Sequence, residues 1–529
     1  MWKAACWALS NNDLYDVKER AMYGALCGNL KAMLEVGGSW EDYVWSYYKT
    51  MVDVATEKRI QQSANIRRPW QHIHSMLLPD EYFLQKSELD DVRTVFEKIG
   101  HSPDKSIAEE AKNPNHFIQR CIILNDMDGL LDEILLWIDE ESIHPQLLRF
   151  AAHLLLILQS FGMTLNYEKC AQILEAYVKQ LISDGRAGHL VAAYTACLPS
   201  DRQLDCYATF LETIEDGDLR KEYLELASEA GLDVTAITKN VVERIRAQGV
   251  PDTAPLQVSQ GDDLTLEPPL TPGDHKKIDA IEWLVFDPAQ RSEALKQSNA
   301  VIRGFLAARK FSAARQVFQK IPRDSVEIIH REWHAVADKD VPLPAGTDNA
   351  IREHICVQAY LSAQSTFSDW FKHFHNKPHE YEPANQASTF ASVSLSDLVA
   401  EEHRQKKQEE ELGRWREVLE GLCFAALDKI YNVLLFPEGG WLVDVREDTE
   451  DNEENRCRHH QMSLLRRLYV PSLCDLLLNV LLNTGGRNDQ CSKLADVIAD
   501  EDNKLYELFT KQEGKRILER IQDAMVDIL

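Results

Sequence analysis

The stretch that most constrains the fold is residues 278–322, where two apolar stripes with helical spacing follow one another closely. Both stripes recur in steps of three and four residues, which is typical of one face of an α-helix. The first stripe consists of Leu295, Ser298, Ile302, Phe305 and Leu306, and the second of Phe311, Ala314, Val317, Phe318 and Ile321. Two short helices joined so tightly must pack antiparallel. The stretch therefore predicts a helical hairpin.

The ends of this hairpin also have local signals. Asp287 stands before Pro288, a favoured first helical residue, and Gln290 follows at capping-box spacing, so we expect a capped helix start there. Pro322 ends the second stripe. Arg303, Arg309 and Lys310 lie off the apolar stripes, and we expect them to point away from the core.

A single helical hairpin cannot bury all of its apolar surface. Each buried Leu, Ile or Phe contributes roughly 1.5 to 3 kcal/mol, so the outer edge of a hairpin favours neighbours stacked on either side. Similar stripes recur over most of the 529 residues, without a strict period. We therefore predict an all-α fold, an irregular α-solenoid.

Composition breaks divide the predicted solenoid. Proline and glycine crowd together with acidic residues in 248–274, which predicts a flexible linker or long loop, and 377–394 is a polar loop. The predicted parts are an N-terminal helical part at 1–247, central hairpins at 275–376 and a C-terminal helical module at 395–529.

Within these parts we predict several single elements. A stripe from Leu14 to Leu34 predicts one helix that ends at Gly37 and Gly38, and 101–115 reads as a polar loop. Two helices are expected around 351–363 and 367–374, followed by a highly charged helix. Three closing helices are expected at about 458–484, 487–500 and 504–529.

Charge and cysteine content exclude some functional classes. A formal net charge of -27 argues against direct nucleic-acid binding, because phosphate contacts need Lys or Arg. The 11 cysteines are scattered in apolar stretches, which is typical of reduced core residues rather than a disulfide framework. The apolar runs 147–161 and 464–482 contain charged residues and fall short of a membrane span, so we predict no transmembrane segment.

Signals for catalysis are weak. There is no phosphate-binding loop of the GxxxxGK[ST] type and no GxSxG nucleophile motif. His330 and His334 share a helix face, but Arg331 stands where a zinc hydrolase has its glutamate. Residues 444–454 lack the central glycine of a calcium loop, so we expect a solvated loop there. We predict no catalytic residue, metal or cofactor, and no enzyme.

Several longer segments carry a resemblance. They are WKAACW at 2–7, ERAMYGALCGNLKAML at 19–34, SWEDYVWSYYKTMVD at 39–53, LDVTAITKNVVERIR at 232–246, IEWLVFDPAQRSEALKQSNAVIRGFLAARK at 281–310, DNAIREHICVQAYL at 348–361 and YNVLLFPEGGWLVDVREDTED at 431–451. Together they resemble the nucleoporin 107/84 family over nearly the whole chain.

The resemblance implies a coatomer-like solenoid folded as trunk and crown, followed by a C-terminal helical tail module. It implies a scaffold role in the Y-shaped outer-ring complex of the nuclear pore, at the nuclear envelope, which would support mRNA export and protein transport. It further implies binding of nucleoporin 133 through the C-terminal tail and of nucleoporin 96 through the N-terminal half. Family members have a long region ahead of the WKAACW segment, so we expect this chain to be a fragment.

A tail that docks another helical protein needs an exposed apolar stripe, and the closing helices offer candidates. These are Leu464, Leu468, Tyr469, Leu473, Leu505, Tyr506 and Phe509, of which we expect a third to a half to face a partner and the others to be core. A coat or adaptor solenoid of a vesicle-coat system is the alternative function. A helical metallohydrolase is a more distant third.

Overall fold

The chain divides into two compact units. The first comprises residues 1–186 with 197–199, and the second comprises 187–196 with 200–529. The computed structural model describes residues 2–62, 78–85, 91–141, 143–185, 187–248, 267–337, 341–378, 395–446, 453–484, 488–501 and 503–526. The predicted linker at 248–274 and the predicted loop at 377–394 lie largely outside these ranges, and the predicted domain boundaries stay predictions.

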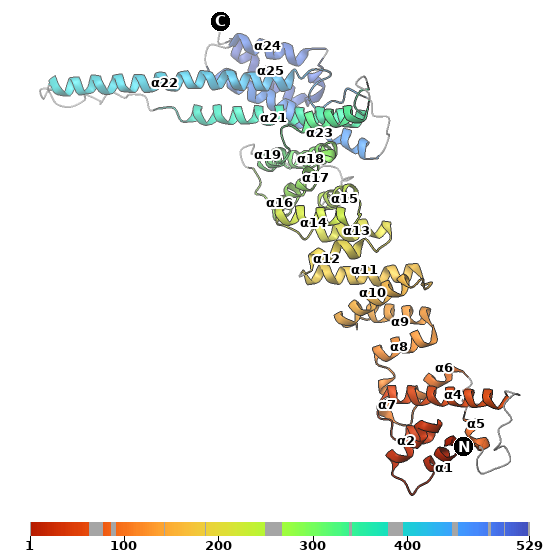
Figure 1. Ribbon diagram of the computed structural model, residues 1–529. Helices are drawn as coiled ribbons and strands as arrows, with labels where there is room; N and C mark the ends of the chain where they lie inside the picture. Colours follow the sequence, from red (N-terminus) through yellow and green to blue (C-terminus); the bar gives the residue numbers. More distant parts are fainter. Residues whose placement is uncertain are drawn as a thin grey trace. The chain divides into compact units, whose positions relative to one another are not determined.

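Eleven helices make up the described part of the first unit (Figure 1). They are α1 (Trp2–Ser10), α2 (Val17–Cys27), α3 (Leu30–Leu34), α4 (Trp40–Gln62), α5 (Asp80–Leu84), α6 (Val92–Gly100), α7 (Lys105–Glu110), α8 (Pro114–Leu124), α9 (Met127–Asp139), α10 (Pro145–Ser160) and α11 (Tyr167–Asp184). Each helix packs mainly on helices next or next but one along the chain, such as α1 on α2, α8 on α9, and α9 and α10 on α11. This sequential packing is that of an α-solenoid.

Two sequence predictions in this unit need correction. The stripe from Leu14 to Leu34 forms two helices, because Gly28 adopts φ +84° and ends α2, and the Asn29 side chain caps α3. The polar region 101–115 contains the short helix α7, which Asp104 caps and whose Ile107 is fully buried. Ile107 joins a core cluster with Trp40, Tyr47 and Phe96, among others.

The second unit contains the remaining helices. They are α12 (Gly188–Thr195), α13 (Ser200–Leu211), α14 (Gly217–Glu229), α15 (Val234–Ala247), α16 (Pro272–Ala280), α17 (Glu282–Val285), the 3₁₀ turn η2 (Pro288–Gln290), α18 (Arg291–Ala307), α19 (Phe311–Lys320), α20 (Ser325–Val336), α21 (Ala345–His375), α22 (Leu395–Leu434), α23 (Glu453–Asn483), α24 (Asn488–Ala499), the 3₁₀ turn η3 (Leu505–Leu508) and α25 (Lys511–Val526). The predicted all-α solenoid is confirmed, and no strand occurs in the ranges described.

The predicted hairpin is α18 and α19, which pack on one another. The first stripe is buried from Leu295 to Leu306. The prediction that Asp287 starts the first helix of the hairpin is wrong in part. The Asp287 side chain does accept a hydrogen bond from Ala289 N at 2.9 Å, but the element that it caps is the short turn η2, and α18 begins only at Arg291. The expectation for Arg303 is wrong, because its side chain is buried in the core.

One long hairpin dominates the second unit. The two helices expected between 351 and 374 are a single helix, α21, of 31 residues, and it runs beside the 40-residue α22 (Figure 1). Trp415 Nε1 donates to the carbonyl of His373 at 2.9 Å, while Arg352 at the other end reaches the residues that follow α22. These pairings make the two helices antiparallel.

The described helices include none that is both long enough and apolar enough to cross a membrane.

Candidate partner-binding surface

The closing helices α23, α24 and α25 pack on one another and present the predicted surface. Thr510 and Glu513 form the start of α25: Thr510 N donates to Glu513 Oε2 at 2.9 Å and Glu513 N donates to Thr510 Oγ1 at 3.3 Å. This reciprocal capping box follows from the T-x-x-E spacing. On the other side of α25, Arg520 donates to Asp475 at 3.2 Å and to Asn479 at 2.6 Å, which ties α25 to α23.

The structure separates the seven predicted site residues into two groups. Tyr469, Leu473 and Leu505 are buried within the unit, so they are core residues and present no surface to a partner. Leu464, Leu468 and Phe509 are half-buried, and Tyr506 is 47% exposed. The surface that remains consists of Tyr506 and Phe509 at the turn η3, together with Leu464 and Leu468 on α23.

Tyr469 shows why part of the stripe had to be core. Its hydroxyl donates to the carbonyl of Leu306 in α18 at 2.5 Å, and its ring lies 4.8 Å from that of Tyr360 and 6.0 Å from that of Phe311. Burial raises the pKa of the Tyr469 hydroxyl far above its ordinary range, which keeps it a neutral donor. The residue joins the tail helices to the central hairpin.

Two exposed apolar residues on α25 were missed from the sequence. Leu518 is 56% exposed and Met525 is 45% exposed, and they stand seven residues apart on one flank of the helix, beside the face of Ile517, Ile521 and Ala524, which are buried. The seven-residue spacing of Leu518 and Met525 is visible in the sequence. The neighbouring apolar stripe of Ile517, Ile521 and Ala524 has more members, however, and it drew attention away from these two residues.

Sequence reasoning also missed a chain of buried charges that joins α18, α21 and the start of α23. Glu353 of α21 is buried between Arg303 of α18 and Arg458 of α23: Arg303 forms an ion pair with one carboxylate oxygen, and Arg458 Nε lies 2.9 Å from the other. Arg458 also forms a bidentate ion pair with Asp444, in which its two terminal nitrogens donate to the two carboxylate oxygens at 2.5 and 2.9 Å. Opposite charges therefore alternate through the core, so each has a partner despite its desolvation.

Asp444 was expected to lie in a solvated loop, and that expectation is wrong for this residue. Its side chain is mostly buried, and His459 Nε2 lies 3.0 Å from its second oxygen. Burial alone would lower the pKa of Arg458, but the hydrogen bonds and charges of Asp444 and Glu353 raise it above its ordinary value. Residues 447–452 of the same acidic stretch lie outside the described ranges.

The segment between α22 and α23, residues 435–446, is fastened to α21 by Arg352. The guanidinium group donates to the carbonyls of Pro437 at 2.6 Å, Glu438 at 2.9 Å and Val443 at 2.7 Å. Glu438 and Leu442 have positive φ angles of 59° and 52°, a conformation that non-glycine residues rarely adopt. The Trp441 indole donates to the carbonyl of Cys356 at 2.8 Å. Hydrogen bonds to Arg352 and to Cys356 of α21 thus stabilise the strained backbone of this segment.

The weak metal candidates do not come together as a site. His330 and His334 lie on an exposed face of α20, with their ring centroids 6.4 Å apart. Among the residues that the structure describes, no group of three or more His, Cys, Asp or Glu side chains could hold a metal ion.

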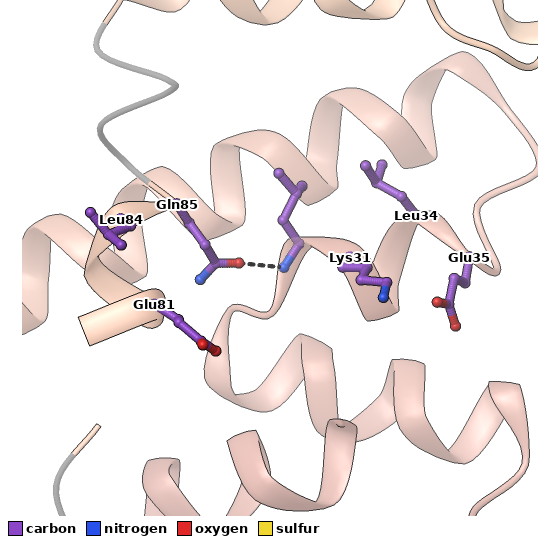
Figure 2. Close-up of a pocket in the computed structure, with 7 residues that line it drawn as sticks. Lys31, Leu34, Glu35, Glu81, Leu84 and Gln85 are labelled. Atoms are coloured by element: carbon purple, nitrogen blue, oxygen red, sulfur yellow. Dashed lines mark hydrogen bonds between the residues drawn. The ribbon is translucent and has the colours of Figure 1, made fainter. Parts of the chain in front are cut away.

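A surface hollow of about 560 Å³ lies in the first unit (Figure 2). It is lined by Leu30, Lys31, Leu34, Glu35, Glu81, Leu84 and Gln85. Gln85 closes one end, since its Oε1 accepts from Leu30 N at 2.9 Å, and Arg20 lies 3.0 Å from Glu35. The lining combines leucine side chains with a glutamine and side chains of opposite charge, and it contains no Ser, Thr, Cys or His.

The comparisons with known proteins agree with one another. The family model described as nuclear pore protein 84 / 107 matches residues 1–525. The nuclear pore complex protein Nup107 of Mus musculus is 41% identical over the whole chain, which covers 55% of that protein. Its Drosophila melanogaster counterpart is 30% identical over the whole chain, covering 60% of that protein, and nucleoporin nup107 of Schizosaccharomyces pombe is 25% identical over 96% of the chain.

The chain therefore spans a little over half the length of these relatives. Because the family model matches almost every residue, and because the observed helical units fit it, the membership is clear. This chain belongs to the nuclear pore protein 84/107 family.

Proposed function

We propose that this chain is a structural scaffold subunit of the outer-ring Y complex of the nuclear pore, located at the nuclear envelope. The observation that carries the proposal is the family match over residues 1–525, and the sequential helix packing of both units supports it. In this role the chain joins other helical nucleoporins. It supports mRNA export and protein transport by building the pore rather than by an enzymatic activity.

The proposal includes two partners. Nucleoporin 133 binds the tail surface around Tyr506 and Phe509, and nucleoporin 96 binds the N-terminal half. Support for the tail surface comes from its geometry: an exposed aromatic ring lies on a turn that α23 and α24 hold rigidly, and Leu505 anchors that turn in the core. Rigid aromatic residues over a packed base are typical anchors of protein interfaces.

The test uses purified chain and the C-terminal domain of nucleoporin 133, with complex formation measured by size-exclusion chromatography with light scattering. The Tyr506→Ala, Phe509→Ala double variant should weaken binding at least ten-fold, because truncated anchors cost about 2 kcal/mol or more. The matched control is Tyr167→Ala, a 67% exposed tyrosine in the first unit, which should leave binding unchanged.

Two outcomes would show that the proposed interface or the proposed partner is wrong. Unchanged binding by the double variant, with loss on Leu518→Asp, would move the interface from the turn η3 to the exposed flank of α25. Absence of any complex with well-folded chain would contradict the tail partnership itself and favour a coat or adaptor role elsewhere.

A further inference from the structure

Arg466 of α23 is a half-buried arginine without a counter-charge. Its Nε atom is buried and has no hydrogen-bond partner, and within the described ranges no carboxylate lies at ion-pairing distance from its guanidinium group. Four other arginines of the same unit each form an ion pair with a carboxylate, and these are Arg220, Arg303, Arg352 and Arg458. A cation removed from water without a partner is unfavourable, so Arg466 lacks one half of the pairing that the other four have.

The charge of Arg466 is not balanced by its other surroundings. Burial lowers the pKa of its guanidinium group below the ordinary value, and the group that opposes this shift is the thiol of Cys356. Burial raises the pKa of that thiol to about 11, so the thiol is neutral at pH 7 and supplies no negative charge. The guanidinium group itself stays charged, as arginine does in proteins. An anion that reaches it therefore meets an unopposed positive charge.

Backbone donors lie beside this charge, at the segment between α22 and α23. A Cβ atom at position 440 would lie 3.4 Å from Arg466 Nη2, so the arginine lies against the face of Gly440 that has no side chain. Glu438, Gly439 and Gly440 have positive φ angles of 59°, 93° and 104°, and their N–H groups make no hydrogen bond within the described ranges. From bond lengths alone, the nitrogen of Gly440 lies within about 6 Å of Nη2. Unpaired N–H groups beside a cation are the donors that proteins use for oxyanions.

A second guanidinium group adds positive charge at the same glycine. Arg352 Nη2 donates to the Gly440 carbonyl at 3.3 Å, and its carboxylate partner, Glu438, lies 3.3 Å away with a side chain that is 68% exposed. Within the described ranges, the guanidinium groups of Arg352 and Arg466 thus share one exposed carboxylate, in a chain whose formal net charge is -27. Because neighbouring like charges repel, a bound anion would stabilise both arginines.

We propose that Arg466, with the unpaired N–H groups of Gly439 and Gly440, forms a binding site for a phosphate group. A tetrahedral dianion can accept from the guanidinium group and from backbone donors together, whereas a carboxylate is satisfied by the guanidinium fork alone. The phosphate is either the free inorganic ion or the monoester of a phosphorylated side chain, which share this chemistry. A site with only a few charge-assisted hydrogen bonds should have a Kd on the order of 1 mM. The inference goes beyond the proposed function and does not rest on it.

Phosphorus NMR of inorganic phosphate mixed with the full chain tests the site without any protein partner. At constant ionic strength, the natural chain should broaden the phosphate signal, and a titration gives the Kd. Arg466→Met should weaken binding at least ten-fold, because it removes all N–H donors of the guanidinium group. Arg466→Lys should weaken binding several-fold, because an ammonium group keeps the charge but lacks the planar fork. The matched control is Arg467→Met, an exposed arginine one position along α23, which should bind phosphate as the natural chain does.

Thermal melts give a readout that separates a binding role of Arg466 from a structural one. Without phosphate, Arg466→Met should melt at or above the temperature of the natural chain, because the change removes an unpaired buried cation. Phosphate at about ten times the Kd should raise the melting temperature of the natural chain and of Arg467→Met, but not that of Arg466→Met. Glu438→Gln should tighten phosphate binding about two-fold, because it removes the nearby negative charge.

Two further probes distinguish the source of the phosphate and the class of anion. O-phosphoserine that binds as tightly as inorganic phosphate would assign the site to a phosphorylated side chain, and its exclusion would assign the site to the free ion. Acetate should bind at least five-fold more weakly than phosphate. The proposal is overturned if phosphate has no more effect than chloride at equal ionic strength, if Arg466→Met binds phosphate as well as the natural chain, or if acetate binds equally tightly.

Discussion

Helices α6 to α11 of the first unit and α18 to α21 of the second are held in place by different means. In the first unit, side chains of Asp91, Asp104, Asn113, Asp126, His144 and Asn166 cap the six consecutive helices α6 to α11, each within its own sequence neighbourhood. In the second unit, α18 to α21 start without any side-chain cap. Arg303, Arg352 and Arg458 instead link elements that lie far apart in the sequence, as Arg303 does with Gln461 at 2.8 Å.

The contrast has a consequence for stability. A cap acts on one helix end, so its loss is local. A buried charge shared by three elements acts on all of them, so its loss spreads. We therefore expect substitutions in the first unit to have small, confined effects and substitutions at the arginine links to loosen most of the second unit's core.

The largest effect should follow from Glu353→Ala. The change leaves Arg303 and Arg458 buried with fewer counter-charges, which should cost about 3 to 5 kcal/mol of unfolding free energy. Hydrogen exchange should rise in peptides of α18, α21 and α23 and stay unchanged in α8 to α11. The control Glu225→Ala breaks an exposed pair with Lys221 and should change stability by less than about 0.5 kcal/mol. Equal loosening of both units would contradict the contrast.

Arg352→Met should have the next largest effect. It removes the donor of four backbone carbonyls, those of Pro437, Glu438, Gly440 and Val443, at a cost of about 1 to 3 kcal/mol. Arg352→Lys should recover little, because an ammonium group cannot reproduce the planar fork of a guanidinium. Faster hydrogen exchange confined to residues 435–446 and the facing part of α21 is the expected readout, and full recovery by lysine would argue that charge alone matters.

His354 should make the stability of the second unit depend on pH. Its ring stacks on Phe318 at 4.4 Å, and burial lowers its pKa to about 4 from an ordinary 6.5. Between these values the unfolded chain binds the proton that the folded chain refuses, so stability falls as pH drops from 6.5 to 4 by up to about 1.4 kcal/mol per unit. Thermal melts of His354→Asn should show a shallower decline, whereas the exposed control His330→Asn should follow the natural chain.

The smallest effect should come from Asn166→Ala in the first unit. The Asn166 side chain accepts from Lys169 N at 3.2 Å and starts α11, so its loss should cost about 1 kcal/mol. Exchange should rise in the first turn of α11 alone. A change as wide as that of Glu353→Ala would show that the first unit is also globally coupled.

The same contrast explains what the sequence could predict. Helix periodicity and capping residues are local, so the hairpin at Arg291–Lys320 and the starts at Asn166 and Asp126 could be predicted from neighbouring residues. Gly28 within the stripe and Asp104 within the polar region were local signals too, and they were outweighed by the longer patterns around them.

The arginine links could not be predicted in this way. Nothing near Arg303 indicates that Glu353 and Gln461 will meet it, because the contact depends on how three helices pack. The sequence could predict that part of the tail stripe is core, but not which residues: Tyr469, Leu473 and Leu505 have the same spacing as exposed residues, and only the position of α18 and α24 makes them core.

The scaffold claim is tested most directly by where the protein resides in the cell. A fluorescent tag placed on the protein at its own locus should give a continuous rim at the nuclear envelope that overlaps other nucleoporins at every pore. Residence on Golgi or endosomal membranes with an unlabelled nuclear rim would contradict the account and support the vesicle-coat alternative.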